Sequence, residues 1–513
     1  MSVDPVVRKL VACGGTMQRH GRSFQSFFGA SSRLLRFPSV VAWCAGLGIA
    51  APLLLGSAAP CMRLTRPGIQ VQGEVKICPG RYRVADPTEL GVIIVASSGT
   101  RLDLTGVTLE SGDSIASEFV GAGVVSRGVS RVTIFGGTIR GYRYGIRLEG
   151  GSGHIVTELD LSGSRSQALR STQDRFDEAD WLDIFRPDSF ELYGGGLLLE
   201  EVDGATVTGV TAQRAQNGIG MIGARRVYVA DNDVSYNSGW GIHLWRSSHN
   251  VIVRNQAHHN ARCESPTYSK GCASAGILLR ERSDSNIVAD NDLTHSGGGF
   301  FLSGDRPLVE PSTGNLVARN NASFAYHNAF ESTFSAGNIF LGNRADNSSY
   351  GFWLGYSTRT TVRGNTVIGS ANAGIAIEHG SDNAIADNVI MGAAIGIRLF
   401  ARNQDHEPSR GYTIDDNVLA DLERALVLEA TTQVKVRGNV FDDVGDAITV
   451  DDAGRETTVV GNVFLRVRGW FISAPRLAAG GNYWALSDAK AIAAKIKGDV
   501  DIAPWFTAAA AGF

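Results

Sequence analysis

The sequence contains little proline and almost no net charge, and both shortages exclude classes of protein. Only 14 of the 513 residues are proline, so the chain is not a disordered tract rich in glycine and proline. The formal net charge is −3, which implies no general surface for binding polyanions. The sequence also lacks a phosphate-binding glycine loop, a serine nucleophile elbow and a basic stripe. We therefore expect no nucleic-acid partner.

Residues 1–58 have the composition of a targeting segment. Scattered basic residues precede an apolar stretch that starts at Phe37, and the small residues Gly56, Ser57 and Ala58 follow this stretch. This order predicts a signal peptide, export to the periplasm or beyond, and no membrane attachment after cleavage. An uncleaved anchor is the alternative, because the apolar stretch is long enough to span a bilayer.

Cysteine is scarce as well. Two of the 6 cysteines, Cys13 and Cys44, lie in the segment expected to be removed. The remaining ones, Cys61, Cys78, Cys263 and Cys272, allow three pairings, of which the local pairs Cys61–Cys78 and Cys263–Cys272 are the natural choice. Disulfides fit an oxidising compartment. A zinc site is possible but poor, because neither pair has the Cys-x-x-Cys spacing.

Glycine, in contrast, is abundant and recurs at a fixed interval. The 62 glycines are about 12 % of the chain, compared with ~7 % in ordinary proteins. A repeated unit begins with glycine and alternating apolar residues and closes on asparagine, as in "GIGMIGARRVYVADN", "GIHLWRSSHNVIVRN" and "GIAIEHGSDNAIADN". Most units begin about 22 residues apart, a period typical of solenoid proteins.

The asparagines of the repeat keep the same interval. Asparagine tolerates the left-handed backbone conformation and bonds its own kind in stacked ladders, so a column of asparagines predicts a repeated turn. β-branched residues that alternate with polar ones, as in Val251–Val253, predict short strands around it. The pattern predicts a parallel β-solenoid. The column consists of Asn232, Asn255, Asn291, Asn320, Asn343, Asn365, Asn388, Asn417, Asn439, Asn462 and Asn482.

On these motifs the sequence resembles the right-handed parallel β-helix superfamily, which includes pectate lyases, alginate C5-epimerases and the NosD-type periplasmic proteins. The closing stretch "GGNYWALSDAKAIAAKIKGDVDIAPWF" is similar to the end of NosD-type chains. The resemblance implies an all-β fold with a single right-handed solenoid of about 15 rungs. We expect an N-terminal cap with the first rungs at residues 59–122, the solenoid at 123–483, and a C-terminal cap at 484–513 with a short helix from Asp488 to Lys497.

Four insertions interrupt the repeat, two at each side of the predicted first sheet. Residues 163–194 and 260–275 precede strands of the first sheet, whereas residues 303–314 and 401–410 follow such strands. Insertions in a solenoid usually gather on one functional face. They predict a groove whose floor is the outer face of the first sheet, although loops also accumulate where they are merely tolerated.

The third and fifth positions of each unit are expected to face this groove, because the apolar residues between them face the core. Aromatic residues at these positions stack on sugar rings, and charged residues fix hydroxyls or carboxylates. We therefore expect a polysaccharide as the partner of a monomeric protein. The predicted substrate-binding residues are Trp240, Trp245, Phe301, Tyr350, Trp353, Glu378 and Arg398.

The predicted catalytic residues are His243, Arg280 and Glu331. A histidine beside an arginine is the pairing needed to exchange the C5 proton of a uronate, with the arginine binding the carboxylate. The resemblance to alginate epimerases and lyases implies the same division of roles between the histidine and the arginine. However, the Asp-Pro-His-Asp motif of alginate epimerases is absent. The nearest string, Asp405-His406-Glu407-Pro408, has another order.

Two alternatives remain open. A glycoside hydrolase would use paired carboxylates such as Glu149 and Glu200 on adjacent rungs, or Glu331 with Asp305 or Arg306. The NosD resemblance implies instead a non-catalytic binding protein for copper-site maturation.

We expect no cofactor and no metal site, although calcium and copper are conceivable. The two "DND" strings, residues 231–233 and 290–292, are better explained by the asparagine column than by calcium. Four turn histidines offer a conceivable cluster, but the sequence has no concentration of soft ligands. These histidines are His258, His259, His295 and His327.

Overall fold

The computed structural model describes residues 61–172, 174–175, 177–184, 192–263, 271–304, 310–402, 409–451 and 456–506. Residues Met1–Pro60 form a unit of their own, and the signal-peptide expectation, together with Cys13 and Cys44, lies outside the described residues. The second unit begins at Cys61. No helix in the described ranges is long and apolar enough to cross a membrane.

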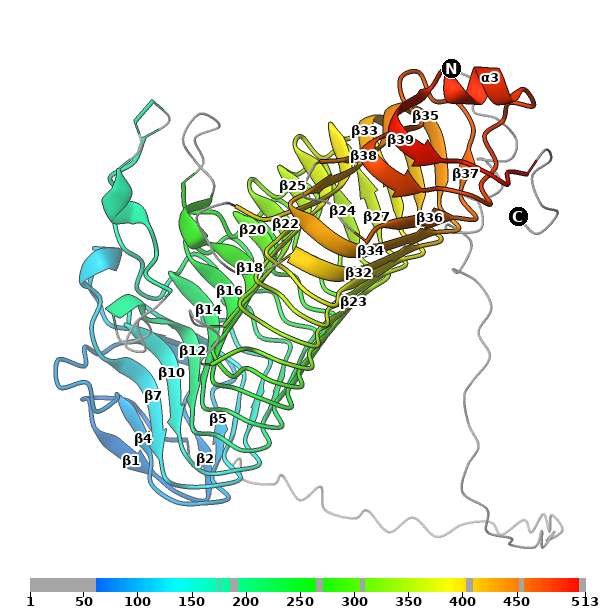
Figure 1. Cartoon of the computed structure of the whole chain (residues 1–513). Helices are drawn as coiled ribbons and strands as arrows, with labels where there is room; N and C mark the ends of the chain where they lie inside the picture. The colour runs from blue at the N-terminus through cyan, green and yellow to red at the C-terminus, as the bar shows by residue number, and fades with distance from the viewer. Residues whose placement is uncertain are drawn as a thin grey trace, which may run out of the picture. The chain divides into compact units, whose positions relative to one another are not determined.

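The strands of the second unit are short, run parallel and stack, as the sequence predicts (Figure 1). They form three columns. β33 and β35 each pair in two columns, because they turn the corner from the third column into the first. The first column contains β1 (Ile69–Val71), β4 (Ile93–Val95), β7 (Ala122–Arg127), β10 (Tyr144–Glu149), β12 (Gly195–Glu200), β14 (Asn217–Ile222), β16 (Trp240–Trp245), β18 (Ala275–Arg280), β20 (Gly298–Ser303), β22 (Asn328–Thr333), β25 (Tyr350–Gly355), β28 (Ala373–Glu378), β31 (Ile395–Phe400), β33 (Val418–Glu429), β35 (Val440–Val450), β38 (Ile472–Ala478) and β39 (Ile496–Asp501).

The second column is made of shorter strands that follow each first-column strand after a turn. It contains β2 (Glu74–Lys76), β5 (Arg101–Asp103), β8 (Thr133–Phe135), β11 (Ile155–Thr157), β13 (Thr206–Thr208), β15 (Tyr228–Ala230), β17 (Val251–Val253), β19 (Ile287–Ala289), β21 (Leu316–Ala318), β23 (Ile339–Leu341), β26 (Thr361–Arg363), β29 (Ala384–Ala386), β32 (Ser409–Asp415), β34 (Thr431–Arg437) and β36 (Thr458–Val460).

The third column is partly reduced to single bridges. Between β9 and β24 it continues through isolated parallel bridges such as Thr211↔Asp233 and Asp233↔Gln256. Its strands are β3 (Gly80–Arg83), β6 (Val107–Glu110), β9 (Thr138–Arg140), β24 (Arg344–Asp346), β27 (Thr366–Ile368), β30 (Val389–Met391) and β37 (Val463–Phe464). The helical turns are η1 (Ala116–Glu118), η2 (Glu178–Asp180), η3 (Gly271–Ala273) and α3 (Ala489–Ala493).

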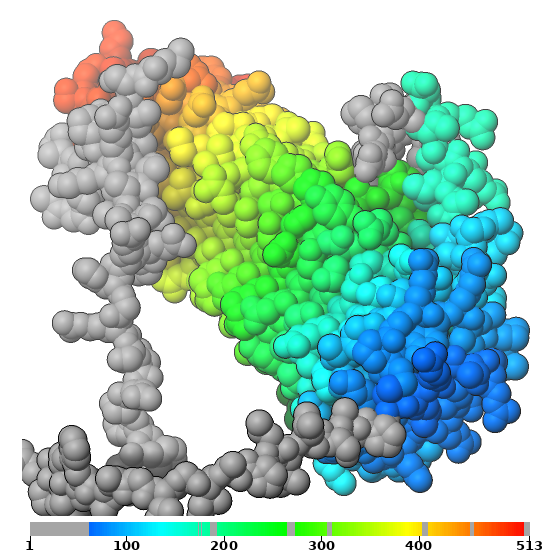
Figure 2. Space-filling model, turned by 180° about the vertical axis from the view of Figure 1, so that it is seen from behind, coloured from blue at the N-terminus to red at the C-terminus, as the bar shows by residue number. Residues whose placement is uncertain are grey.

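The core runs through the middle of the stack, because alternate strand residues face inward. Ile242 and Leu244 of β16 are fully buried there. Further along the stack, the core-facing rings of Phe330 and Phe352 lie parallel at 4.9 Å between centroids. Seen from behind, successive rungs form one continuous surface in sequence order (Figure 2).

The asparagine column forms the expected ladder. The amide of Asn291, for example, donates to Asn320 Oδ1 at 2.9 Å, and that of Asn320 donates to Asn343 Oδ1 at 3.2 Å. One part of the expectation is wrong: the left-handed conformation belongs to the residue before each asparagine, such as Asp290 with φ 58°. The turn thereby points each asparagine side chain into the stack, where it is buried.

The two predicted disulfides, Cys61–Cys78 and Cys263–Cys272, are confirmed. The first lies at the N-terminal end of the solenoid. At the other end, Asp488 accepts a hydrogen bond from the backbone N–H of Ala491 and begins α3. The predicted helix is too long, because residues 496–501 pair with β38 as strand β39 instead.

We predict that Asn320→Ala lowers the free energy of unfolding by roughly 2–4 kcal/mol, because it leaves buried donors and acceptors without partners. The Asn320 side chain donates to Val288 O and Asn343 Oδ1 and accepts from the amide and backbone N–H of Asn291. Guanidinium denaturation measures the change. The control is Asn372→Ala, at an exposed turn position. Equal denaturation midpoints for the two variants would show that the asparagine ladder contributes nothing to the free energy of unfolding.

Candidate functional site

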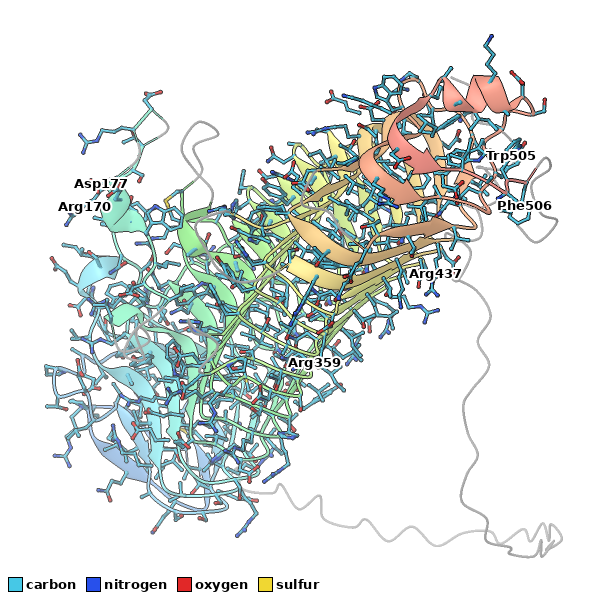
Figure 3. All side chains as sticks on the ribbon, viewed as in Figure 1. Arg170, Asp177, Arg359, Arg437, Trp505 and Phe506 are labelled. Carbon is cyan, nitrogen blue, oxygen red and sulfur yellow. A yellow bond between two sulfur atoms is a disulfide. The ribbon has the colours of Figure 1, made fainter. Side chains whose placement is uncertain are left out.

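The long insertion, residues 163–194, lies across the outer face of the first column. Its residues Leu182, Ile184 and Tyr193 pack in one buried cluster with Trp240 and Leu278. The arm that carries Arg170 and Asp177 stands out from the body of the solenoid, whereas Arg359 and Arg437 lie on the other side (Figure 3). The insertion therefore covers part of the expected groove instead of forming its wall.

Buried polar contacts hold the insertion in place. The guanidinium of Arg262 donates to Asp180 O, to Gln167 Oε1 at 2.8 Å and to Ser238 O at 3.3 Å. The carbonyl of Cys272, in the disulfide loop, accepts from the backbone N–H of Leu182 at 3.2 Å. The sequence gives no signal for the role of Arg262, because it lies outside the repeated unit.

His243 is fully buried beneath this cover, between Trp240 and Trp245. Burial lowers the pKa of its imidazole to about 3, and the charge of Arg280 adds to the effect. The ring is therefore neutral at ordinary pH. The expectation that His243, Trp240 and Trp245 face an open groove is wrong, because the insertion closes this section; the tryptophans are 0 % and 3 % exposed.

Arg280 is also fully buried and is engaged by the protein itself. Its Nε donates to Ile184 O at 2.8 Å, its Nη1 donates to Ser303 Oγ at 3.2 Å and to Gly304 O, and its Nη2 lies 3.4 Å from Glu281 Oε1. These contacts fix the insertion to the sheet. The expectation of a carboxylate clamp open to substrate at Arg280 therefore needs correction.

Beyond the insertion the outer face is accessible. Glu331 is in register with Phe301 on one neighbouring rung and with Trp353 on the other. These side chains and Tyr350 are all partly exposed, and the Tyr350 and Trp353 rings lie 5.0 Å apart. We call Phe301, Glu331, Tyr350 and Trp353 the aromatic platform. It brings together one predicted catalytic residue and three predicted sugar-stacking residues.

The environment of Glu331 favours its neutral form. Burial raises the pKa of its carboxyl to about 7, and a hydrogen bond from Asn328 Nδ2 at 2.7 Å opposes this rise. A carboxyl with a pKa near neutrality exchanges protons readily at physiological pH. The role of Asn328 is absent from the predictions, since it precedes the strand positions expected to face outward.

Two further predicted site residues lie at the far side of the platform in ion pairs. Arg398 is partly exposed; its Nη2 lies 2.6 Å from Glu429 Oε2, and its guanidinium lies 4.3 Å from the centroid of the Phe400 ring. Glu378 is buried, and Arg402 Nε lies 2.7 Å from its Oε1. Arg398 is therefore the more accessible of the two.

The two carboxylates of the hydrolase alternative are already engaged in ion pairs. Glu149 and Glu200 are adjacent in register, and Arg147 lies between them, with its nitrogens 2.8 Å and 2.9 Å from their oxygens. Asp305, Arg306 and the string 405–408 lie outside the described residues.

The metal alternatives find no support in the described chain. Asp231 and Asp290 of the "DND" strings pair with arginines of the next rung, and the asparagines belong to the ladder. His259 and His295 stack face to face at 4.7 Å between centroids. Across the described ranges, no group of three or more His, Cys, Asp or Glu side chains is placed to hold a metal ion.

Sequence comparison agrees with this architecture. The sequence matches the family model described as "Right handed beta helix region" over residues 195–367 and 345–464, which together span more than half of the chain. The chain therefore belongs to this family of right-handed β-helices. No curated protein shows a significant sequence match.

Three solved structures illustrate the likeness of fold. A variant of the periplasmic alginate epimerase AlgG is 12% identical, with a TM-score of 0.38 over 74% of this chain and 75% of that one. The catalytic domain of an alpha-1,3-glucanase is 11% identical, with a TM-score of 0.42 over 73% and 62%. PfbA, a surface adhesin of Streptococcus pneumoniae, is 11% identical, with a TM-score of 0.39 over 75% and 85%.

We predict that the stability of the wild type, relative to Glu331→Gln, falls as the pH rises from about 5 to 8. The raised pKa means that the folded state holds the Glu331 proton more tightly than the unfolded chain. The stabilisation is fully present below the ordinary glutamate value of 4.5 and is lost as the pH rises through about 7. Denaturation midpoints at several pH values measure it. Glu423→Gln, at an exposed position, is the control, and a pH-independent difference between Glu331→Gln and the wild type would contradict the assignment.

We predict that Arg262→Ala loosens the insertion, because the contacts to Asp180 and Gln167 are lost. Chymotrypsin should then cleave near the exposed Trp181 about 10-fold faster than in the wild type, because local opening becomes more frequent. The unfolding midpoint of the solenoid should hardly change. The control is Arg424→Ala, at an exposed strand position, which should be cleaved at the wild-type rate. If Arg262→Ala were also cleaved at the wild-type rate, contacts other than those of Arg262 would be holding the insertion in place.

Proposed function

We propose that the protein is exported, binds a polysaccharide along the outer face of the first column and modifies it by proton transfer at Glu331. One observation carries this proposal: the carboxyl of Glu331, a partly exposed residue, has a pKa raised to about 7 by burial and lies in register between Phe301 and Trp353. The two disulfides fit an oxidising compartment, and hence export.

The platform suits a sugar chain for two physical reasons. Aromatic faces bind the apolar faces of sugar rings, and exposed rings without a partner are otherwise unfavourable in water. The rings also follow one another along the stack, since parallel strands place Phe301 and Trp353 on either side of Glu331 at a spacing of about 4.8 Å per rung. An extended polymer can therefore contact several rungs at once.

The action that we propose is epimerase- or lyase-like, on an acidic glycan. Glu331, in its ionised form, would take the C5 proton next to a uronate carboxylate and, in lyase-like action, pass it to the glycosidic oxygen that leaves C4 as the double bond forms. In epimerase-like action, a water on the opposite face of the ring would supply the new C5 proton. Arg398 occupies the same outward position three rungs further along, through Trp353 and Ala376. It would bind the carboxylate of a sugar about three residues further along the chain, in exchange for Glu429. His243 and Arg280 would take part only after the insertion has moved.

We predict that Glu331→Gln lowers turnover at least about 100-fold and leaves glycan binding nearly unchanged, because the amide cannot exchange the proton. Trp353→Ala should weaken binding about 10-fold through loss of ring stacking. Polymannuronate, polygalacturonate and a neutral glucan form the panel. Unsaturated product, exchange of the C5 proton with deuterium and new reducing ends report lyase, epimerase and hydrolase action separately.

The matched control is Trp470→Ala, since Trp470 is 38 % exposed on the surface and lies outside the platform. Binding that depends on Trp353, without turnover of any glycan, would support the non-catalytic alternative. The absence of both binding and turnover for every glycan of the panel would refute the proposed function.

A further inference from the structure

A second concave site lies on the third column near the N-terminal end of the solenoid, away from the aromatic platform. It has a volume of about 240 Å³ and is lined by three arginines, two acidic residues, Phe119 and three glycines. Arg81 and Arg83 come from β3 and Arg140 comes from β9. We call this site the arginine pocket.

Two of the three guanidinium groups, those of Arg81 and Arg140, share one carboxylate. Arg83, Glu110 and Arg140 are in register on successive strands. Glu110 accepts two hydrogen bonds from Arg81, both at 2.9 Å, and two from Arg140, at 3.0 Å from Nη2 and 3.3 Å from Nε. These arginines, Arg81 foremost, hold the pKa of the Glu110 carboxyl below its ordinary value. A single ionised carboxylate therefore balances only one of the two cations.

Arg83 turns away from this carboxylate. Its Nη2 donates a hydrogen bond to the carbonyl oxygen of Gly112 at 3.0 Å. Within the described residues, neither Arg83 nor Asp113, an exposed residue on the pocket lining, forms an ion pair. Three guanidinium groups against two carboxylates leave the lining with one excess positive charge. The three arginines are exposed, so their remaining donors face solvent and are accessible to a ligand.

Glycine keeps the pocket open beside these donors. A Cβ atom at Gly112 would lie 2.7 Å from Arg83 Nε, so any side chain at this position would displace the guanidinium. Gly112 also has φ +95°, a conformation that other residues rarely adopt. The backbone can therefore approach a bound group closely.

We propose that the arginine pocket binds a sugar through an oxyanion that the sugar carries, either a uronate carboxylate or a sulfate ester. Guanidinium groups bind such oxyanions with paired hydrogen bonds. The cavity is larger than a bare anion needs, and Phe119 adds an apolar side to its lining, which suits the ring of one monosaccharide. This site is independent of Glu331 and of the proposed reaction.

The test is calorimetric titration of the full-length protein with methyl glucuronide, glucose 6-sulfate, glucose and inorganic sulfate. We expect saturable binding of the two charged sugars, weakened about 10-fold in Arg83→Gln and in Arg140→Gln through loss of charge-assisted hydrogen bonds. Glucose should not bind. Arg476→Gln, at an exposed position on β38, lies outside both the pocket and the platform and should bind the charged sugars like the wild type.

Three outcomes would overturn the inference. The first is the absence of saturable binding for both charged sugars, and the second is equal binding by the wild type and the two pocket variants. In the third, inorganic sulfate binds as tightly as glucose 6-sulfate, which would reduce the pocket to a site for a bare anion. Circular dichroism of Arg83→Gln and Arg140→Gln confirms that each variant is folded.

Discussion

Parallel rungs stacked in register are the constraint on which the whole solenoid depends. A strand of three or six residues buries too little surface to be stable alone, so each rung is stable only through its neighbours. Each side chain therefore lies directly above the equivalent one of the next rung. Asn291, Asn320 and Asn343 satisfy their buried amides only in this register. A shift by one residue would break the ladder and turn the core residues outward.

The same constraint makes the candidate site a single line of residues. His243, Leu278, Phe301, Glu331 and Trp353 occupy one outward position on successive rungs. What differs along this line is the cover over it, since the insertion buries the first part and leaves the later part accessible. Burial disfavours the charged form of an acid and of a base alike, so His243 loses basicity while the pKa of Glu331 rises toward neutrality.

The sequence predicts the structure of the repeated units, and it does not predict the path of the insertion between them. The glycine and asparagine intervals define the columns, and from the columns follow the outward positions of Phe301, Glu331 and Trp353. The path of the insertion has no period, and its few apolar residues, such as Leu182 and Ile184, do not reveal which surface they cover. The seven residues "GWGIHLW" do carry a signal, because two tryptophans on one strand need to be covered. The cover is the protein's own insertion rather than a ligand.

Charge pairing between rungs follows a rule that the arginine pocket breaks. Along the outer edge of the solenoid, single arginines pair with single aspartates of an adjacent rung, as in Arg254–Asp231, Arg319–Asp290 and Arg437–Asp415. In such a pair each charge is balanced within the stack. In the pocket, Arg81 and Arg140 instead converge on Glu110, and Arg83 beside them has only a backbone carbonyl. Since three cationic side chains line the pocket against two carboxylates, an anion that binds there would balance the remaining positive charge.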